Sequence, residues 1–149
     1  AIDAPVGARM MFVPQTSYLP IGTLKAALTY PATPDTFSDD ACRDALRACR
    51  LEDYVERLDE TAHWTRVLSP GEQQRLAGAR VLLHKPDFLF LDEATSALDT
   101  DNEARLYHLF AERLPKAAIV SIAHRESLAA FHVGTINVER VNAGDKVAA

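Results

Sequence analysis

The most regular pattern of apolar and polar positions lies near the middle of the chain. Leu76, Ala79 and Leu83 recur at helical spacing, so we predict a helix with one packing face that ends near residues 85–86. A continuous apolar run, residues 88–91, follows almost at once. This run is too short for a helix and is apolar on both faces, which is typical of a strand buried in a parallel sheet.

The start of this helix has its own signature. Ser69 and Glu72 have the S-x-x-E spacing of a capping box, and Pro70 occupies the first helical position, so the helix is predicted to begin at Ser69. Its first turn presents free N–H groups, the positive end of the helix dipole and the small residue Gly71, an arrangement that can hold a phosphate. Taken alone, the same pattern also fits an ordinary, well-capped core helix.

Two adjacent carboxylates, Asp92 and Glu93, follow the predicted strand directly. The carboxyl ends of strands are where open α/β sheets place their ligands. Neighbouring carboxylates are costly unless a cation or a proton uses them. The pair therefore suggests a cation site, although in isolation it also fits a solvated acidic turn.

The remaining elements alternate between strands and helices and predict an α/β fold. We expect buried strands over 9–13, with residues 14–15 as the exit, and over 117–122, and a terminal strand over 132–140. We expect a loop over 31–39, a helix capped by Ser38, a short helix over 51–58, and a helix capped by a second S/T-x-x-E box over 100–103 that continues to Leu114.

Composition narrows the class of protein. The chain has 149 residues, of which 48% are hydrophobic and 25% charged, and these are ordinary values for one globular domain. Its net charge of −5 argues against a nucleic-acid partner. Cys42 and Cys49 lack C-x-x-C spacing, so we expect reduced cysteines that pack in the core rather than a redox or zinc pair. No apolar run reaches the length of a membrane span. We therefore expect a soluble chain.

Five short segments together resemble one protein family, the ATP-binding cassette (ABC) ATPases. In the family's order they match its Q-loop, signature, Walker B, D-loop and H-loop motifs: residues 13–15 (VPQ), 68–75 (LSPGEQQR), 88–93 (FLFLDE), 96–99 (SALD) and 121–124 (SIAH). The resemblance covers residues 9–125. The segment after Gln15 resembles transporter-type members, and Trp64 is similar in place to a tryptophan of the fatty-acyl or peroxisomal branch and its bacterial relatives.

No G-x-x-x-x-G-K-[ST] motif is present, so the chain resembles the C-terminal two-thirds of an ABC nucleotide-binding domain. The resemblance implies a partial P-loop NTPase (RecA-like) parallel sheet from residues 1–24 and 86–140, joined to a helical subdomain over 25–85. It also implies a strand order of P-loop strand, His124 strand, Asp92 strand and Gln15 strand. Without the P-loop strand, residues 117–122 would form an open edge, for which we expect self-association.

The resemblance also implies roles for individual residues, with ATP and Mg²⁺ as cofactors. Asp92 and Gln15 would hold Mg²⁺, Glu93 would orient and deprotonate the attacking water, and His124 would contact the γ-phosphate. Phosphoryl transfer depends mostly on positioning and charge stabilisation, so no covalent nucleophile is needed.

A second group of residues is implied to serve the nucleotide of another subunit. Ser69, Gly71 and Glu72 in the signature would bind the γ-phosphate held by a second nucleotide-binding domain in a head-to-tail dimer, and Asp99 would lie at the dimer seam. The family's usual signature has glycine in place of Pro70, which has no backbone donor, and glutamine in place of Glu72. This departure puts the phosphate affinity of the half-site in question.

Three functions fit these residues. The first is an ATPase that powers a membrane transporter, partnered by a transmembrane domain and placed at the cytoplasmic face of the membrane. The second is a soluble ABC ATPase that acts on DNA or ribosomes, and the third is a binding module that never touches nucleotide. In every case residues 1–149 alone are expected to be inactive towards ATP, because the P-loop cradle is absent.

Overall fold

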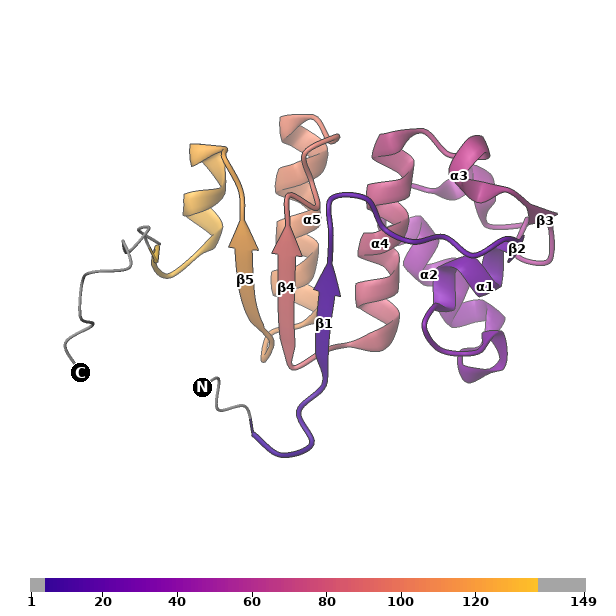
Figure 1. The fold of residues 1–149 in the computed structure, drawn as a ribbon, viewed down its shortest axis with the longest axis horizontal. Coiled ribbons are helices and arrows are strands. Elements are labelled where there is room, and N and C mark those ends of the chain that lie inside the picture. The colour runs from indigo at the N-terminus through magenta and orange to yellow at the C-terminus, as the bar shows by residue number, and fades with distance from the viewer. Residues whose placement is uncertain (1–4, 137–149) are drawn as a thin grey trace, which may run out of the picture.

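The computed structural model describes residues 5–136 and contains a three-stranded parallel sheet flanked by helices (Figure 1). The sheet has the order β1-β4-β5, formed by Met10–Val13, Phe88–Asp92 and Ala118–Ile122. In parallel register Val13 pairs with Leu91, and Asp92 with Ile122. The predicted order of the Gln15, Asp92 and His124 strands is therefore confirmed, as is the α/β fold class.

Two long helices pack near the sheet. α4 (Pro70–His84) stands between the sheet and the other helices, and α5 (Thr100–Arg113) lies behind the sheet in this view (Figure 1). α4 contacts α1, α2 and α5, and its turns are buried nearly all round, as expected of a helix in the middle of a core. Its end is set by Lys85, which adopts a left-handed conformation at φ +46° and matches the predicted helix end.

The helical part lies between β1 and α4 in sequence. It comprises α1 (Leu24–Thr29), α2 (Asp39–Ala48) and α3 (Trp64–Val67), with the small antiparallel pair β2 (Gly22–Thr23) and β3 (Thr61–Ala62). Ser38 caps α2 as predicted. Trp64 is 1% exposed and donates its indole N–H to the carbonyl of Gly22 at 3.0 Å, so it anchors the approach to α4.

The prediction of a short helix over residues 51–58 is wrong. Only one 3₁₀ turn forms, Glu52–Tyr54, and i→i+3 hydrogen bonds continue as separate turns to Glu60. The apolar spacing reflects burial of Leu51, Tyr54, Val55 and Leu58 rather than helix, because the chain must turn here to reach β3. The predicted loop over 31–39 contains a 3₁₀ turn, Pro34–Thr36, and α1 was not predicted.

The prediction of a second capping box over residues 100–103 is also wrong. Asp99, one residue before Thr100, caps α5 by accepting the backbone N–H of Asn102 at 2.8 Å. Glu103 is 2% exposed and is bonded to residues outside the helix instead. Of the terminal strand predicted over 132–140, residues 132–136 are not strand, and the rest lie outside the described residues.

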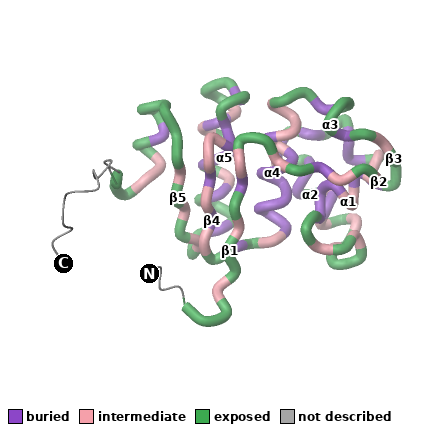
Figure 2. The backbone as a smooth tube through the Cα atoms, viewed as in Figure 1, coloured by how far each residue is buried: buried purple, intermediate pink, exposed green. Residues whose placement is uncertain are grey.

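Burial alternates from residue to residue along the strands (Figure 2), so the two faces of the sheet differ in burial. Val13, Leu89 and Leu91 are buried, whereas the alternate positions are open: Met10, Phe12, Val120 and Ile122 are exposed. Residues 88 and 90 of β4 are only half-buried, which corrects the expectation that this strand is covered on both faces. No described helix is long and apolar enough to cross a bilayer.

Candidate functional site

The carboxyl ends of the three strands carry the predicted catalytic residues. Glu93 follows β4, and its backbone N–H donates to the carbonyl of Ile122 at 2.9 Å, which ties it to the end of β5. His124 follows β5, and its Nε2 lies 2.9 Å from Oε1 of Glu93. The structure therefore brings these two side chains, 31 positions apart, into direct contact at one edge.

Glu93 adopts an unusual backbone conformation. Its φ of +48° lies in the left-handed region, which non-glycine residues rarely adopt and which costs on the order of 1–2 kcal/mol. The carbonyl of Glu93 accepts the N–H of Ser96 at 3.0 Å, closing a turn directly after the strand. This turn directs the side chain towards His124 while Asp92 is still part of the strand.

Gln15 reaches the same edge from β1. Because Val13 pairs with Leu91 in parallel, Gln15 and Glu93 each lie two residues beyond paired positions. The amide nitrogen of Gln15 donates to Oγ of Ser96 at 3.2 Å. A cavity of about 340 Å³ opens beside this contact, lined in part by Gln15, Gln74, Ser96 and the first residue of α4, Pro70.

The donor set at this edge suits Mg²⁺. The carboxylate of Asp92 and the amide oxygen of Gln15 are hard oxygen ligands, and Mg²⁺ typically takes one or two carboxylates together with water and phosphate oxygens. The described residues contain no cluster of three or more acidic, histidine or cysteine side chains that could hold a metal by themselves. A site completed by water and phosphate therefore fits the residues present.

The predicted capping box at the start of α4 is confirmed. Oγ of Ser69 accepts the N–H of Glu72 at 3.3 Å, and Oε2 of Glu72 accepts the backbone N–H of Ser69 at 2.8 Å. The hydroxyl of Tyr54 donates to the other oxygen of Glu72 at 3.1 Å. Burial raises the pKa of Glu72, but the hydrogen bonds from Ser69 and Tyr54 outweigh it and hold the pKa below its usual value. Both carboxylate oxygens of Glu72 thus stabilise the helix end.

Gly71 places the first turn of α4 next to the segment after Glu93. A methyl group added at Gly71 would lie 3.4 Å from the carbonyl oxygen of Ala97, at the short limit of ordinary van der Waals contact. Within the described residues no hydrogen bond joins Ser69 to Glu93 or His124. The helix end and the Glu93–His124 pair are therefore two separate groups of site residues.

Asp99 lies at the far end of the segment that follows Glu93, where it caps α5. Its carboxylate accepts both the backbone and the side-chain N–H of Asn102, at 2.8 and 2.9 Å. The backbone hydrogen bond is the main reason why the pKa of Asp99 is lowered. The carboxylate therefore stays ionised and fixes where the segment ends.

Sequence reasoning missed the residues that hold the segment between Glu93 and Asp99. Arg125 donates to the carbonyls of Leu98 and Ser96, at 2.9 and 3.2 Å, and to the buried carboxylate of Glu103 at 3.2 Å. On the other side, the 6% exposed carboxamide of Gln74 bonds to Ser96 and to the N–H of Ala97. A polar residue three and four positions before the buried Ala77 and Gly78 is the signal that could have identified Gln74.

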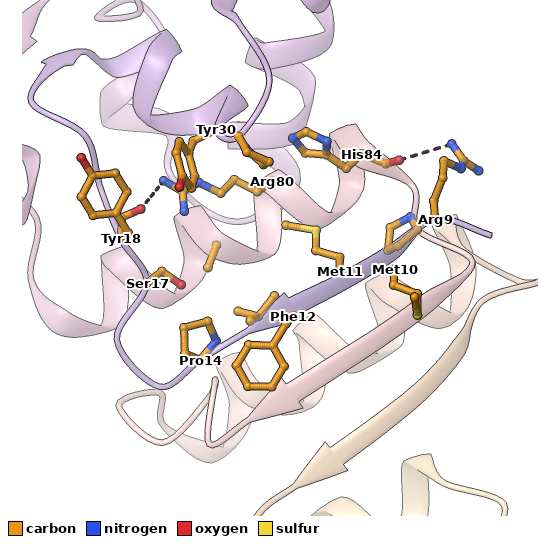
Figure 3. A pocket seen from close by; sticks show the side chains of 14 residues that line it. Arg9, Met10, Met11, Phe12, Pro14, Ser17, Tyr18, Tyr30, Arg80 and His84 are labelled. Atoms are coloured by element: carbon orange, nitrogen blue, oxygen red, sulfur yellow. Dashed lines mark hydrogen bonds between the residues drawn. The ribbon is translucent and has the colours of Figure 1, made fainter. Parts of the chain in front are cut away.

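A larger cavity, of about 450 Å³, lies away from these residues, between β1 and the helical part (Figure 3). Arg80 lines it and is 4% exposed, and its guanidinium donates to the carbonyls of Ala27 and Tyr18 at 2.7 and 2.8 Å. Burial lowers the pKa of Arg80 to about 10. None of the predicted site residues lines this cavity. Arg80, by its bond to Tyr18, holds the chain that follows Gln15.

Comparison with known proteins places these features in context. The sequence profile described as ABC transporter matches residues 5–96. The chain is 43% identical over 122 residues to an uncharacterized ABC transporter ATP-binding protein of Haemophilus influenzae, covering 82% of this chain and 21% of that protein. It is 36% identical over 154 residues to the chloroplastic ABC transporter D family member 2 of Arabidopsis thaliana, covering 83% of this chain and 21% of that protein.

Two further matches agree with these. ATP-binding cassette sub-family D member 3 of Mus musculus is 35% identical over 139 residues, covering 88% of this chain and 21% of that protein. The structure of a bacterial Atm1-family ABC exporter with ATP bound superposes with a TM-score of 0.70 at 31% identity, covering 82% of this chain and 22% of the exporter chain. The chain thus spans about a fifth of the length of the proteins it matches.

Proposed function

Because the chain belongs to the ABC transporter family, we propose that it is part of a cassette that binds and hydrolyses ATP to drive transport across a membrane. The observation that supports this most directly is the contact of 2.9 Å between Glu93 and His124 at the sheet edge that also carries Asp92 and Gln15. This arrangement combines a base, a polarising side chain and two oxygen ligands, which are the groups that phosphoryl transfer to water requires.

We assign each side chain one role in the reaction. The carboxylate of Glu93 orients the attacking water and accepts its proton on Oε1 or Oε2. Nε2 of His124, which lies 2.9 Å from Oε1 of Glu93 in this structure, would donate its hydrogen bond to a phosphoryl oxygen when nucleotide is bound, while the turn at Ser96 holds Glu93 in place. Asp92 and Gln15 would hold Mg²⁺, which would supply positive charge to neutralise the phosphate oxygens. Rate acceleration then comes from positioning and charge stabilisation.

The start of α4 is proposed to act on a second nucleotide. The N–H of Gly71 would donate to the γ-phosphate held by another copy of the cassette, so that two sites are shared in a head-to-tail dimer. The hydroxyl of Ser69 donates to Oε2 of Glu72 at 2.7 Å in this structure and would turn to the same phosphate when it is bound. The carboxylate of Glu72 supports this by fixing the helix end, and Asp99 would lie at the seam. Pro70 supplies no N–H here, so Gly71 and Ser69 carry the interaction.

The transport function involves further partners. We propose that a transmembrane part of the same transporter completes the protein and places this cassette at the cytoplasmic face of the membrane. Two of the relatives described above are named ABC transporters, two belong to the D family, and the similar solved structure is that of an exporter, which favours transport over action on DNA or ribosomes. The D-family likeness also supports the branch indicated by the sequence.

The substitution Glu93→Gln in the intact protein tests this proposal. Removal of a positioned base is expected to lower steady-state ATP turnover by about two orders of magnitude or more, whereas ATP binding remains because the carboxamide is of equal size. Glu112→Gln, at an exposed carboxylate on α5, should retain normal turnover. If Glu93→Gln hydrolysed ATP at a near-normal rate, the assignment of Glu93 as the base would be wrong.

A further inference from the structure

Gln74 is the buried side chain that connects α4 to both segments of the proposed site. It lies in the second turn of α4 and is 6% exposed. A buried carboxamide is costly unless its polar atoms are bonded. Nε2 of Gln74 donates to the carbonyl of Gln15 and to Oγ of Ser96, both at 3.3 Å, and Oε1 accepts the N–H of Ala97 at 2.9 Å.

These bonds converge with one from Gln15. Oγ of Ser96 accepts from the side-chain amides of both Gln15 and Gln74, at 3.2 and 3.3 Å, which uses both lone pairs of the hydroxyl. The rotamer of Gln15 is thereby coupled to the position of Ser96, and both are coupled to Gln74. The three residues come from segments 22 to 81 positions apart, and each is hydrogen-bonded to the other two.

The connection runs through a rigid element. Gln74 is five residues after Ser69 on the same helix, a rise of roughly 7.5 Å at 1.5 Å per residue. The same helix holds the segment after Gln15 at a second point, through Arg80 and the carbonyl of Tyr18 (Figure 3). A displacement at the first turn of α4 is therefore passed to Gln15 and Ser96 through Gln74, whose amide nitrogen and oxygen are both hydrogen-bonded.

We infer that Gln74 is a positioning residue that couples occupancy at the start of α4 to the alignment of Gln15 and the Ser96 turn in the neighbouring site. This inference rests on the proposed function, because it treats Ser69 and Gly71 as contacts to a nucleotide held by a second copy. Gln74 touches no nucleotide itself. It sets where the metal-binding amide and the turn that carries Glu93 lie when the first turn of α4 is engaged.

The expected kinetic signature separates this role from simple support of the fold. Loss of alignment affects the reacting geometry more than binding, so Gln74→Leu in the intact transporter should lower kcat by about 10- to 100-fold with KM for ATP changed less than about threefold. Because the coupling links two sites, the Hill coefficient for ATP hydrolysis should fall towards 1. A variant that only loosened the fold would instead lower the amount of active protein at unchanged cooperativity.

A double-mutant cycle provides the decisive measurement. Gln74→Leu combined with Ser96→Ala should lower kcat little further than the worse single variant, because both remove the same junction. Gln73→Leu is the matched control, since its carboxamide is adjacent on α4 but bonds to the carbonyls of Thr65 and Leu68. Its effect on kcat should multiply with that of Ser96→Ala.

Several outcomes would overturn the inference. Wild-type kcat and cooperativity in Gln74→Leu, or effects that multiply with those of Ser96→Ala, would show that Gln74 does not act through this junction. If Gln74→Leu fails to fold, Gln74→Glu replaces it. Glutamate keeps the size of the side chain and the acceptor for the N–H of Ala97, but loses the amide donor to Gln15 and Ser96. Misfolding of both variants would show a purely structural role. Absence of ATP turnover in the wild-type transporter would refute the proposed function instead.

Discussion

Removal of the guanidinium of Arg125 should destabilise the fold through the carboxylate it leaves behind. Glu103 is 2% exposed, and its two oxygens accept from Oγ1 of Thr95 at 2.6 Å and from Arg125 at 3.2 Å. Removing one partner of a buried ion pair typically costs about 3–5 kcal/mol, because a buried charge loses its compensation. Arg125→Ala is the simplest substitution that produces this state.

The magnitude must be reduced for exposure on the Arg125 side. The side chain of Arg125 is 41% exposed, so truncation admits water to the carboxylate, which also keeps the Thr95 hydroxyl and lies in the first turn of α5 near its positive end. The carbonyls of Ser96 and Leu98 can bond to water once Arg125 is gone. We therefore expect a loss of about 2–3 kcal/mol in the free energy of unfolding, or a fall in Tm of roughly 4–12 °C.

Urea unfolding followed by circular dichroism measures this loss. Arg113→Ala is the matched control, because the ion pair of Arg113 with Asp44 has similar length, 3.2 Å, but side chains that are 47% and 63% exposed, and it should cost less than about 1 kcal/mol. Adding Glu103→Gln to Arg125→Ala should recover stability by removing the buried charge. Equal costs for both arginines, or a double variant less stable than Arg125→Ala, would refute the reasoning.

Three further predictions concern the chain as a whole. Among the described residues, β5 has a neighbouring strand only on its β4 side. Sedimentation should therefore show self-association of the chain, and Val120→Lys should reduce it. A chain that stays monomeric at high concentration, with rapid amide exchange along β5, would contradict this. Burial raises the pKa of the Cys49 thiol to about 12. The buried neutral thiol therefore contributes fully to stability below the unfolded-state pKa of roughly 8.5, and this contribution is lost as pH rises towards 12. Unfolding midpoints measured across that pH range should fall as pH rises. Calorimetry with Mg-ATP should show residues 1–149 binding no more tightly than about millimolar, because the phosphate cradle of a P-loop is absent from this sequence, and a micromolar dissociation constant would contradict it.

Features set by neighbouring residues were predicted well. The capping box of Ser69 and Glu72 closes within four positions, and the left-handed end at Lys85 comes just before Pro86. The strands 88–92 and 118–122 were evident from their apolar runs, and the resemblance supplied their order. For such elements the determining interactions are contained in the segment itself or in the pairing of parallel strands.

Features set by tertiary contacts were not predicted. The segment after Asp99 has the spacing of a second capping box, but Glu103 is recruited by Thr95 and Arg125 and so cannot return to the helix end. The turns over 51–58 follow from where β3 must begin. The junction of Gln74 with Ser96 and Gln15 depends on bonds across 22 and 59 positions, and spacing within one element carries no information about them.

The left-handed backbone at Glu93 sets stability against activity at one position. At φ +48° a glycine would be free of the strain that any residue with a Cβ bears, yet glycine has no carboxylate to contact His124. The residue that suits the turn best is thus the one that abolishes the proposed chemistry. Folding alone would favour glycine or asparagine here, so glutamate at this position gives up some stability for the proposed chemistry.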